Sequence, residues 1–356
     1  MERRLFLKGN EALAAAAIKA GCRFYFGYPI TPQNDIPEYL SRHMPRTEGC
    51  FIQAESEVAA INMLLGASAA GARAMTSSSS PGISLMQEGI SYLAGSELPA
   101  VIVNITRSGP GLGGISASQG DYFQATRGGG HGDYRTIVLA PHSVQEMHDL
   151  TLLAFDLADK YRNPVLVLGD AVLGQMQEGM IDRPYRLPQL PPKDWALTGA
   201  AGRNPRLIKS LYLKEGEMER HNWKLHEKYQ QVKREEVRFE AHQEEDAELL
   251  VVAFGTAARV ARTAVDRARQ TGWKTGLFRP ITLFPFPEEP LNRLSRRIKH
   301  LLAIEMNTGQ MVEDVRLAVQ GDARVKFYGH PPGSAPSPEE LLAAIEENHR
   351  FHEAGI

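Results

Sequence analysis

The stretch from Phe51 to Gly82, FIQAESEVAAINMLLGASAAGARAMTSSSSPG, constrains the fold most, because it holds two strands and two helix starts in one short run. We expect a strand over FIQA, a helix from Glu57 with Ser56 as its N-cap, a strand over RAMTSS and a second helix after Pro81. The first helix carries almost no charge before Arg73, and a helix that is apolar on all sides is buried in a core or against another subunit. The run therefore predicts a strand–helix–strand unit of a large α/β domain.

The same alternation of strands and helices extends from Gly9 to Asp170. Short strands are predicted over RFYFGY, AVIVNI, TIVLA and PVLVLGD, and continuous apolar runs such as AVIVNI are typical of buried parallel strands. Strict alternation predicts a doubly wound domain, with a parallel sheet covered by helices on both faces. Ligands of such folds bind beyond the carboxyl ends of the strands.

The second half of the chain divides into a charged part and a smaller domain. A proline-rich stretch, Pro184–Pro192, marks the exit from the first domain, and the charged residues from about Arg206 to Glu245 predict a long, largely solvated helix. Apolar strands from LLVVAFG to RVKFYG alternate with helices again. We expect a domain over residues 1–190, a charged helical linker over 191–246 and a second α/β domain over 247–356.

The composition excludes several classes of protein. Forty basic and forty-two acidic residues give a net charge of -2, which offers no reason to expect a nucleic-acid partner. The only cysteines, Cys22 and Cys50, cannot hold an iron–sulfur cluster alone, because clusters usually take four thiolates; we expect both to be reduced and buried. The N-terminal MERRLFLKGNEAL is charged and short of apolar length, so neither a signal peptide nor a membrane span is expected, and the protein is expected to be cytoplasmic.

Candidate site residues follow directly after predicted strands, namely Thr31, Glu57, Ser77, Ser78 and Arg107. Because the carboxyl ends of parallel strands share one edge of a sheet, this placement predicts a common site. A carboxylate at the mouth of an apolar helix is partly desolvated, and such groups tend to be functional. Glu55 is an alternative to Glu57, because the phase between strand and helix does not separate the two.

A glycine-rich loop runs from Arg107 to Tyr134 and contains SGPGLGGISASQGDYFQATRGGGHGD. Glycines let a backbone approach a ligand closely or move as a lid. The loop contains no GxxxxGK[ST] pattern, so a phosphate-binding P-loop is not supported. His131 lies between glycines in this loop and is either structural or close to substrate or cofactor.

The chain resembles a known family along nearly its whole length, apart from the charged stretch. The motifs GNEALAAAAIKAG, YPITPQND, the Phe51 run and EMNTGQM are similar to those of the alpha subunit of 2-oxoacid:ferredoxin oxidoreductases. The resemblance implies a thiamine diphosphate enzyme that decarboxylates a 2-oxoacid, passes the acyl group to coenzyme A and reduces ferredoxin. It also implies a pyrimidine-binding first domain and a second domain like the transketolase C-terminal domain.

The resemblance also implies residue roles. Glu57 matches the glutamate that activates the cofactor by sharing a proton with its aminopyrimidine ring, the alternative being a carboxylate held by the helix dipole. Thr31 and Arg107 match positions that hold the substrate's carboxylate and keto oxygen, and the planar guanidinium suits a carboxylate. Alternatively, Arg107 pairs with Asp121 or Asp133, and the Thr31 hydroxyl bonds its own backbone.

Further contacts are expected on the same basis. The residues expected to touch the cofactor are Pro29, Ile30, Ser78 and Ser79, and His131 is assigned to the substrate. Ser77 to Ser80 can alternatively be plain helix-capping hydroxyls. The EMNTGQM run, Glu305–Met311, marks a subunit contact, an approach for coenzyme A, or only a turn at a strand end.

Half of the family's cofactor site is absent from this chain. The family's diphosphate and Mg²⁺ site is a GDG with a downstream Asn on the beta subunit, whereas LGDAVLG here departs from it at Ala171. We therefore expect no metal site in this chain and an obligate hetero-oligomer. The expected partners are a beta subunit that carries Mg²⁺, a ferredoxin-like iron–sulfur subunit, a gamma subunit as a further candidate, and ferredoxin.

The substrate is the least constrained feature. YPITPQNDIPEYLSR and GGGHGDYRTIVLAP most resemble the members that act on branched-chain 2-oxoacids such as 3-methyl-2-oxobutanoate. The alternatives are the same chemistry on 2-oxoglutarate, pyruvate or an aryl pyruvate, and a non-catalytic scaffold with the same fold. The joint presence of Glu57, Thr31 and Arg107 argues against the scaffold.

Overall fold

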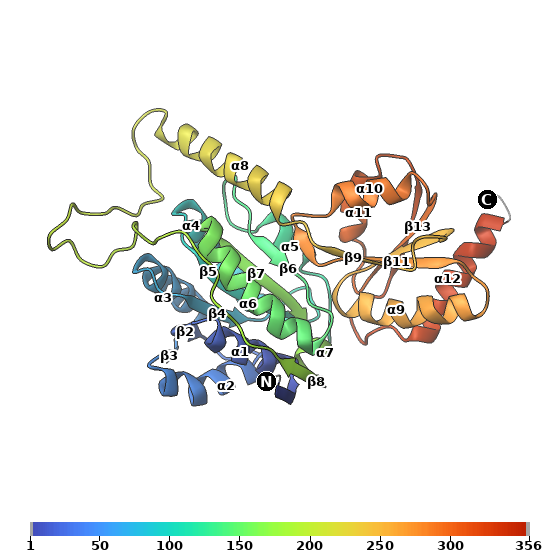
Figure 1. Ribbon diagram of the computed structural model, residues 1–356, viewed down its shortest axis with the longest axis horizontal. Helices are drawn as coiled ribbons and strands as arrows, with labels where there is room; N and C mark the ends of the chain where they lie inside the picture. The colour runs from blue at the N-terminus through green and yellow to red at the C-terminus, as the bar shows by residue number, and fades with distance from the viewer. Residues whose placement is uncertain (1–2, 354–356) are drawn as a thin grey trace.

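The chain forms two α/β units that lie side by side, as Figure 1 shows for a computed structural model that describes residues 3–353. The first sheet has the strand order β12-β6-β7-β5-β4-β2-β3 and the second the order β14-β13-β10-β11-β9. Strands β2 to β7 of the first sheet pair in parallel. The predicted α/β class with a parallel sheet and a second α/β domain is confirmed.

The first unit contains eight strands, of which β1 and β8 form a separate antiparallel pair that the sequence did not predict. The strands are β1 (Arg3–Lys8), β2 (Phe24–Gly27), β3 (Cys50–Gln53), β4 (Ala74–Ser78), β5 (Ala100–Thr106), β6 (Ile137–Leu139), β7 (Pro164–Asp170) and β8 (Gln177–Asp182). Every residue of β4, β5 and β7 is buried, as expected for central strands of a parallel sheet that is covered on both faces.

Helices cover both faces of this sheet (Figure 1). They are α1 (Gly9–Lys19), α2 (Asp35–His43), the short 3-10 helix η1 (Met44–Thr47), α3 (Glu57–Ala69), α4 (Pro81–Gly95), α5 (Tyr122–Arg127), α6 (Val144–Tyr161) and α7 (Ala171–Gln175). Helix α3 begins at Glu57 because the Ser56 hydroxyl accepts a hydrogen bond from the Ala59 amide at 3.2 Å, so the predicted N-cap is confirmed.

The middle stretch is less helical than its charge pattern predicts. Residues 183–216 contain neither helix nor strand, and α8 (Glu217–Glu235) is shorter than the helix expected from about Arg206 to Glu245. Four of its side chains are buried, and His221 Nε2 donates to the Gly95 carbonyl of the first unit at 2.7 Å. The expectation of a largely solvated helix was therefore wrong for one face of α8, because apolar residues at helical spacing pack that face against the first unit. The division at residues 190 and 246 stays a prediction.

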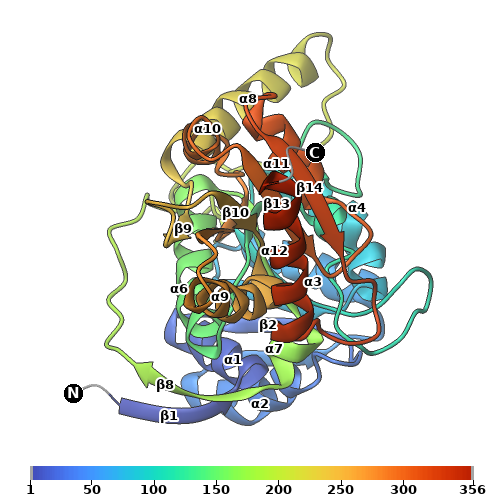
Figure 2. The same ribbon diagram turned by 90° about the vertical axis from the view of Figure 1, so that its right-hand side faces the viewer.

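The second unit is a five-stranded sheet with helices on both faces. Its elements are β9 (Phe239–His242), β10 (Leu249–Val252), α9 (Gly255–Gln270), β11 (Thr275–Pro280), β12 (Thr282–Phe284), α10 (Glu288–Ser295), β13 (His300–Glu305), α11 (Met311–Val319), β14 (Arg324–Gly329) and α12 (Pro338–Glu353). Helices α9 and α12 lie together on one face and α10 and α11 on the other (Figure 2). Strand β12 leaves this unit and pairs antiparallel with β6 of the first sheet.

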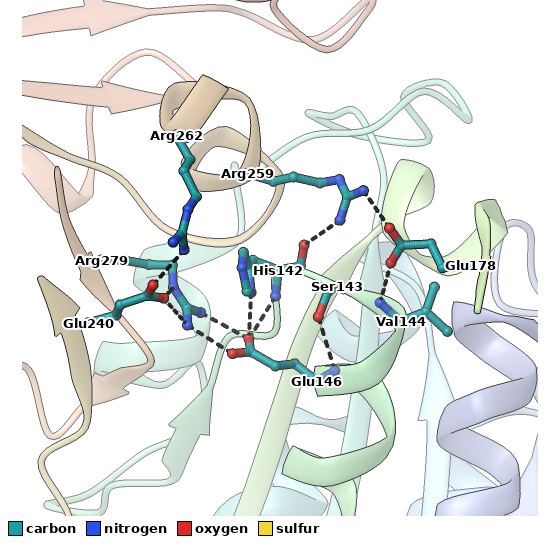
Figure 3. Close-up of polar contacts among 9 residues, drawn as sticks. All are labelled: His142, Ser143, Val144, Glu146, Glu178, Glu240, Arg259, Arg262 and Arg279. Carbon is teal, nitrogen blue, oxygen red and sulfur yellow. Dashed lines mark hydrogen bonds and ion pairs between the residues drawn. The ribbon is translucent and has the colours of Figure 1, made fainter. Parts of the chain in front are cut away.

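Ion pairs join the two units around Glu146 of α6, as Figure 3 shows. Arg279 of β11 donates to both Glu146 oxygens, at 2.9 and 2.8 Å, and the His142 ring lies 2.8 Å from the same carboxylate. Arg279 also holds Glu240 of β9, and Arg259 of α9 pairs with Glu178 of β8. Burial raises the pKa of Glu146, but the hydrogen bonds from His142 and Arg279 outweigh it and lower the pKa to about 2.

Two further expectations concern single features. Both cysteines are free; Cys22 is buried and Cys50 is partly buried. Burial raises the pKa of the Cys22 thiol to about 12, so this thiol stays protonated at neutral pH. Over residues 3–353, the helices lack the length and apolar character that crossing a membrane requires.

Candidate functional site

Three neighbouring strands bring the candidate residues to one edge of the first sheet. Arg107 follows β5, Ser78 ends β4, and Thr31 lies in the turn after β2; β4 lies between the other two strands. Glu57 enters the same region as the first residue of α3. The common edge predicted from the sequence therefore exists, and parallel pairing is its cause.

Glu57 is buried, with 6% of its surface exposed, whereas Glu55 is exposed. The structure thereby separates the two acids that the sequence left open and favours Glu57 as the desolvated one. A Cβ atom at Gly82 would lie 2.5 Å from Glu57 Oε1 and 2.0 Å from Ser78 Oγ, so only glycine fits where α4 begins beside this carboxylate. Among the described residues, none forms a hydrogen bond with the Glu57 carboxylate.

Arg107 is buried and its guanidinium is held by main-chain carbonyls. Nη1 donates to the Thr31 carbonyl and Nη2 to the Leu112 carbonyl, each at 3.0 Å, while Nε has no partner. Neither Asp121 nor Asp133 pairs with it among the residues described, so the ion-pair alternative for Arg107 is not found. Two of the five donors of a guanidinium are used, which leaves others for a ligand.

The turn after β2 presents its side chains to the outside. Thr31 and Pro29 are exposed and Ile30 is partly buried. The Thr31 hydroxyl forms no hydrogen bond with the part of the chain that the structure describes, so the alternative of a purely local turn bond is not found. The turn itself is fixed through Pro32, whose carbonyl accepts from Asn10 Nδ2 at 3.0 Å and from Gln175 Nε2 at 2.8 Å.

The serines of the TSSSS run differ in what they contact. Ser77 Oγ lies 2.8 Å from the Tyr25 hydroxyl and donates to Gln33 Oε1 at 2.6 Å, so it is part of the internal structure. The hydroxyls of Ser78 and Ser79 are buried and have no partner among the protein atoms described. Leaving a buried hydroxyl without a hydrogen bond costs about 1–3 kcal/mol, and such groups call for a ligand or another explanation.

His131 does not lie with this group. It lines a hollow at the C-terminal end of α4, together with Tyr92 and Gly95. Helix α4 begins at the Glu57 carboxylate, and it rises about 20 Å between Gly82 and Gly95 at 1.5 Å per residue. The glycine-rich loop passes from one end of the sheet to the other between Arg107 and His131. His131 is therefore left out of the site proposed below.

Sequence reasoning missed Asn104 of β5, a polar residue that links Ser80 to Asp121 close to Arg107. Asn104 Oδ1 accepts from the Ser80 amide at 3.0 Å, and its Nδ2 donates to Asp121 at 2.8 Å. Burial raises the pKa of Asp121, although hydrogen bonds from Ser80 and Asn104 oppose the shift. Ser80 Oγ in turn accepts from the Arg107 amide at 3.0 Å. A polar Asn in the otherwise apolar run AVIVNI was the signal that could have found this support.

The arrangement combines a buried acid, unbonded hydroxyls and a guanidinium at an open surface. Large apolar side chains are exposed on the neighbouring elements, namely Ile52, Val58, Met63 and Leu85. Clusters of three or more metal-ligating side chains are not found among residues 3–353. The free donors of Arg107 can bind an organic anion, and the Glu57 carboxylate can share a proton with a nitrogen base. Exposed apolar side chains of this kind are typical of surfaces that bind another molecule.

Comparison with known proteins identifies the class. Residues 15–245 match the family described as "Pyruvate flavodoxin/ferredoxin oxidoreductase, thiamine diP-bdg", and residues 247–341 match "Pyruvate:ferredoxin oxidoreductase core domain II". The chain belongs to the pyruvate flavodoxin/ferredoxin oxidoreductase family, as its motifs predicted, and its first domain is the thiamine diphosphate-binding domain.

The relatives align with nearly the whole length of the chain. The ketoisovalerate oxidoreductase subunit VorB of Methanothermobacter marburgensis is 51% identical, with 96% of this chain and 97% of the relative covered. The 2-oxoglutarate synthase subunit KorA of Methanothermobacter thermautotrophicus is 38% identical, covering 98% and 100%. The 2-oxoglutarate:ferredoxin oxidoreductase structure from Magnetococcus marinus, with 2-oxoglutarate, coenzyme A and succinyl-CoA bound, superimposes with a TM-score of 0.87 at 27% identity. The alignment covers 97% of this chain and 65% of that one.

Proposed function

We propose that the chain is the alpha subunit of an oxidoreductase that converts a branched-chain 2-oxoacid, such as 3-methyl-2-oxobutanoate, and coenzyme A into the acyl-CoA and CO₂, with ferredoxin as electron acceptor. The name of the ketoisovalerate relatives supports this substrate. A hollow of about 440 Å³ beside Thr31 supports it independently, because its described lining is mostly small or apolar and includes no Lys, Arg or His. A dicarboxylate such as 2-oxoglutarate would need a second cation there.

The residues present fit the pyrimidine half of thiamine diphosphate. The cofactor supplies the carbanion that adds to the keto carbon and accepts the electron pair left by CO₂. Glu57 would hold the proton that it shares with the ring nitrogen of the aminopyrimidine, because the carboxylate is buried and has no partner in the described chain. The unbonded hydroxyls of Ser78 and Ser79, and the turn residues Pro29 and Ile30, are the proposed contacts to the cofactor.

The substrate contacts follow from the free donors at the same edge. Arg107 would bind the substrate carboxylate through Nε and its remaining Nη hydrogens, since its fork is already oriented by two carbonyls. The Thr31 hydroxyl, exposed and without a hydrogen-bond partner among the described residues, would donate to the keto oxygen. Pre-orientation of the Arg107 guanidinium favours the reactive geometry, because little freedom of this side chain is lost on binding.

Partner chains would complete the site. Asp170 of LGDAVLG caps α7 by accepting from the Val172 and Leu173 amides, at 3.0 and 3.1 Å, which supports a diphosphate and Mg²⁺ site on a beta subunit. The apolar side chains exposed beside Glu57 would then be covered by that subunit. Two cysteines in the whole sequence support the placement of iron–sulfur clusters on another subunit.

The buried, unpartnered Glu57 is the observation that carries the proposal. The test is 2-oxoacid-dependent reduction of a low-potential dye by the complex purified with its partner subunits, in the presence of thiamine diphosphate, Mg²⁺ and coenzyme A. We expect a higher kcat/KM for 3-methyl-2-oxobutanoate than for 2-oxoglutarate or pyruvate. A preference for 2-oxoglutarate would overturn the substrate, and no turnover of any 2-oxoacid by the intact complex would support the scaffold instead.

A further inference from the structure

The EMNTGQM run forms the turn between β13 and α11, and hydrogen bonds to the Glu305 carboxylate hold this turn together. The Glu305 carboxylate is fully buried and accepts from the amides of Met311 and Val312, at 2.7 and 2.9 Å. It also accepts from Asn307 Nδ2 at 2.9 Å. The strand-end turn considered from the sequence is therefore present. Its polar groups cap the start of α11 and also bond to the first unit.

Every polar group of Gln119, in the glycine-rich loop, is bonded to the second unit, and three of the four bonds go to Met306 and Asn307 of the turn. The Gln119 amide donates to the Met306 carbonyl at 2.9 Å, and Oε1 accepts from the Met306 amide at 3.0 Å. The Gln119 carbonyl accepts from Asn307 Nδ2 at 2.9 Å, and Nε2 donates to the Phe254 carbonyl at 2.8 Å. All four bonds cross from the first unit to the second, and Gln119 is 3% exposed.

The segment between Arg107 and Gln119 folds back on itself. The Ser108 amide donates to the Ser116 carbonyl at 2.9 Å, and Gly113 lies so close to Ser108 that a Cβ there would be 1.7 Å from its carbonyl oxygen. The tip of this segment supplies the Leu112 carbonyl that Arg107 Nη2 contacts. One end of the segment is thus fixed by β5 and the other by the second unit.

Building on the substrate role of Arg107 proposed above, we propose that the EMNTGQM turn is a clamp that positions Arg107 for the substrate carboxylate. Asn307 and Met306 hold Gln119, Gln119 fixes the far end of loop 108–118, and the loop orients the guanidinium through the Leu112 carbonyl. Gln119 and Asn307 are positioning residues, because neither contacts the proposed ligand-binding groups directly. The second unit therefore acts on substrate binding at a site that the first unit builds.

The test uses four variants of the chain in the complex with its partner subunits: Gln119→Ala, Arg107→Lys, the double variant, and Arg259→Ala as the matched control. Arg259 also joins the two units, through Glu178 and the His142 carbonyl, but does not touch the loop. Gln119→Ala removes the two side-chain bonds of this residue and is expected to raise KM for the 2-oxoacid about five-fold with kcat nearly unchanged, which corresponds to about 1 kcal/mol, the net contribution of a buried hydrogen bond. Arg259→Ala is expected to leave KM unchanged.

The double variant tells whether Gln119 acts by positioning Arg107 or whether its loss makes the structure less rigid in general. If Gln119 acts through Arg107, then adding Gln119→Ala to Arg107→Lys should change KM less than two-fold, because the two effects are coupled. Equal and additive effects would overturn the clamp. If Arg107→Lys leaves KM unchanged, the substrate role proposed for Arg107 is wrong, and the loop measurement below still decides whether the clamp exists.

Hydrogen exchange gives a readout that needs no activity. The amides of residues 108–118 should exchange faster in Gln119→Ala than in the unmodified chain, and at the unmodified rate in Arg259→Ala. Should Gln119→Ala fail to fold, Gln119→Met keeps most of the side-chain volume and removes the same two side-chain bonds, so a similar rise in KM is expected. Unchanged exchange in a folded Gln119 variant would overturn the clamp.

Discussion

Glu57 and Glu305 occupy similar places in the two units but meet opposite surroundings. Glu57 is the first residue of α3, soon after β3, and Glu305 is the last residue of β13; both lie beside the first turn of a helix and are buried. Glu305 accepts hydrogen bonds from three main-chain amides and from Asn307, and burial nevertheless raises its pKa. Glu57 has no partner among residues 3–353, and the hydroxyl of Ser78 beside it has none either. A saturated buried acid supports the fold, whereas an unsaturated one marks a place where another molecule belongs.

The largest effect is expected for Glu57→Gln. The variant should lose about 1000-fold in kcat, because an amide cannot share a proton with the ring nitrogen in the way an acid does. Its melting temperature should be equal or higher, because the buried carboxylate makes no hydrogen bond with residues 3–353 that the amide would lose. Dye reduction and calorimetry measure the two quantities, and Glu55→Gln, at the exposed acid, serves as control. Full activity in Glu57→Gln would mean that Glu57 has no role in the reaction and is a structural acid like Glu305.

The reverse pattern is expected for Glu305→Ala. Removing this carboxylate leaves buried amides at the start of α11 without an acceptor, so the free energy of unfolding should fall by about 3 kcal/mol. Chemical denaturation of the purified chain checks this, with Glu289→Ala, at the exposed start of α10, as the matched control. A loss no larger than that of the control would show that Glu305 is not the structural counterpart of Glu57.

Glu146 is a third acid to compare with Glu57 and Glu305, and its contribution to stability should depend on pH. The pKa of Glu146 is about 2 in the folded chain against about 4.5 for a free side chain, so its ionised form stabilises the fold. This stabilisation is fully present above pH 4.5 and is lost as the pH falls toward 2. The unfolding free energy should therefore fall less steeply in this window for Glu146→Gln than for the unmodified chain. Parallel curves for the two chains would contradict the assignment; Glu38→Gln, on the exposed surface of α2, is the control.

The smallest effect is expected for Ser78→Ala. Its hydroxyl makes no bond within the described protein, so the variant should unfold within about 0.5 kcal/mol of the unmodified chain. Thiamine diphosphate binding to the complex, measured by calorimetry, should weaken several-fold if the hydroxyl contacts the cofactor. Ser77→Ala offers the contrast, since it breaks bonds to Tyr25 and Gln33 and should lower stability instead.

Much of the fold and part of the site followed from the sequence. Apolar runs such as PVLVLGD set the parallel strands, and the strand ends placed Thr31, Ser78 and Arg107 together, because parallel strands share their carboxyl edge. The choice between Glu55 and Glu57 needed the three-dimensional direction of each side chain. The position of His131, apart from the other candidates, did not follow from the sequence, because a glycine-rich loop carries no periodic pattern that tells which end of the sheet it reaches.

Other features were beyond the sequence because distant partners create them. The pairing of β1 with β8 joins segments more than a hundred residues apart. Neither segment alternates apolar and polar residues clearly enough to predict a strand. The role of EMNTGQM depends on Gln119, which a pattern search along the chain does not connect with it. Long-range contacts of this kind are set by packing rather than by local propensity.

Strand β12 has a consequence for how the protein can be divided. The chain leaves the second sheet after β11, adds β12 to the edge of the first sheet beside β6, and then returns to complete the second unit. A fragment that stops at residue 246 would lack this strand and would expose the edge of β6, which invites pairing with other chains. The first sheet is therefore complete only when the second unit supplies β12. Natural or engineered versions that separate them on two polypeptides must place the break elsewhere or supply the missing strand.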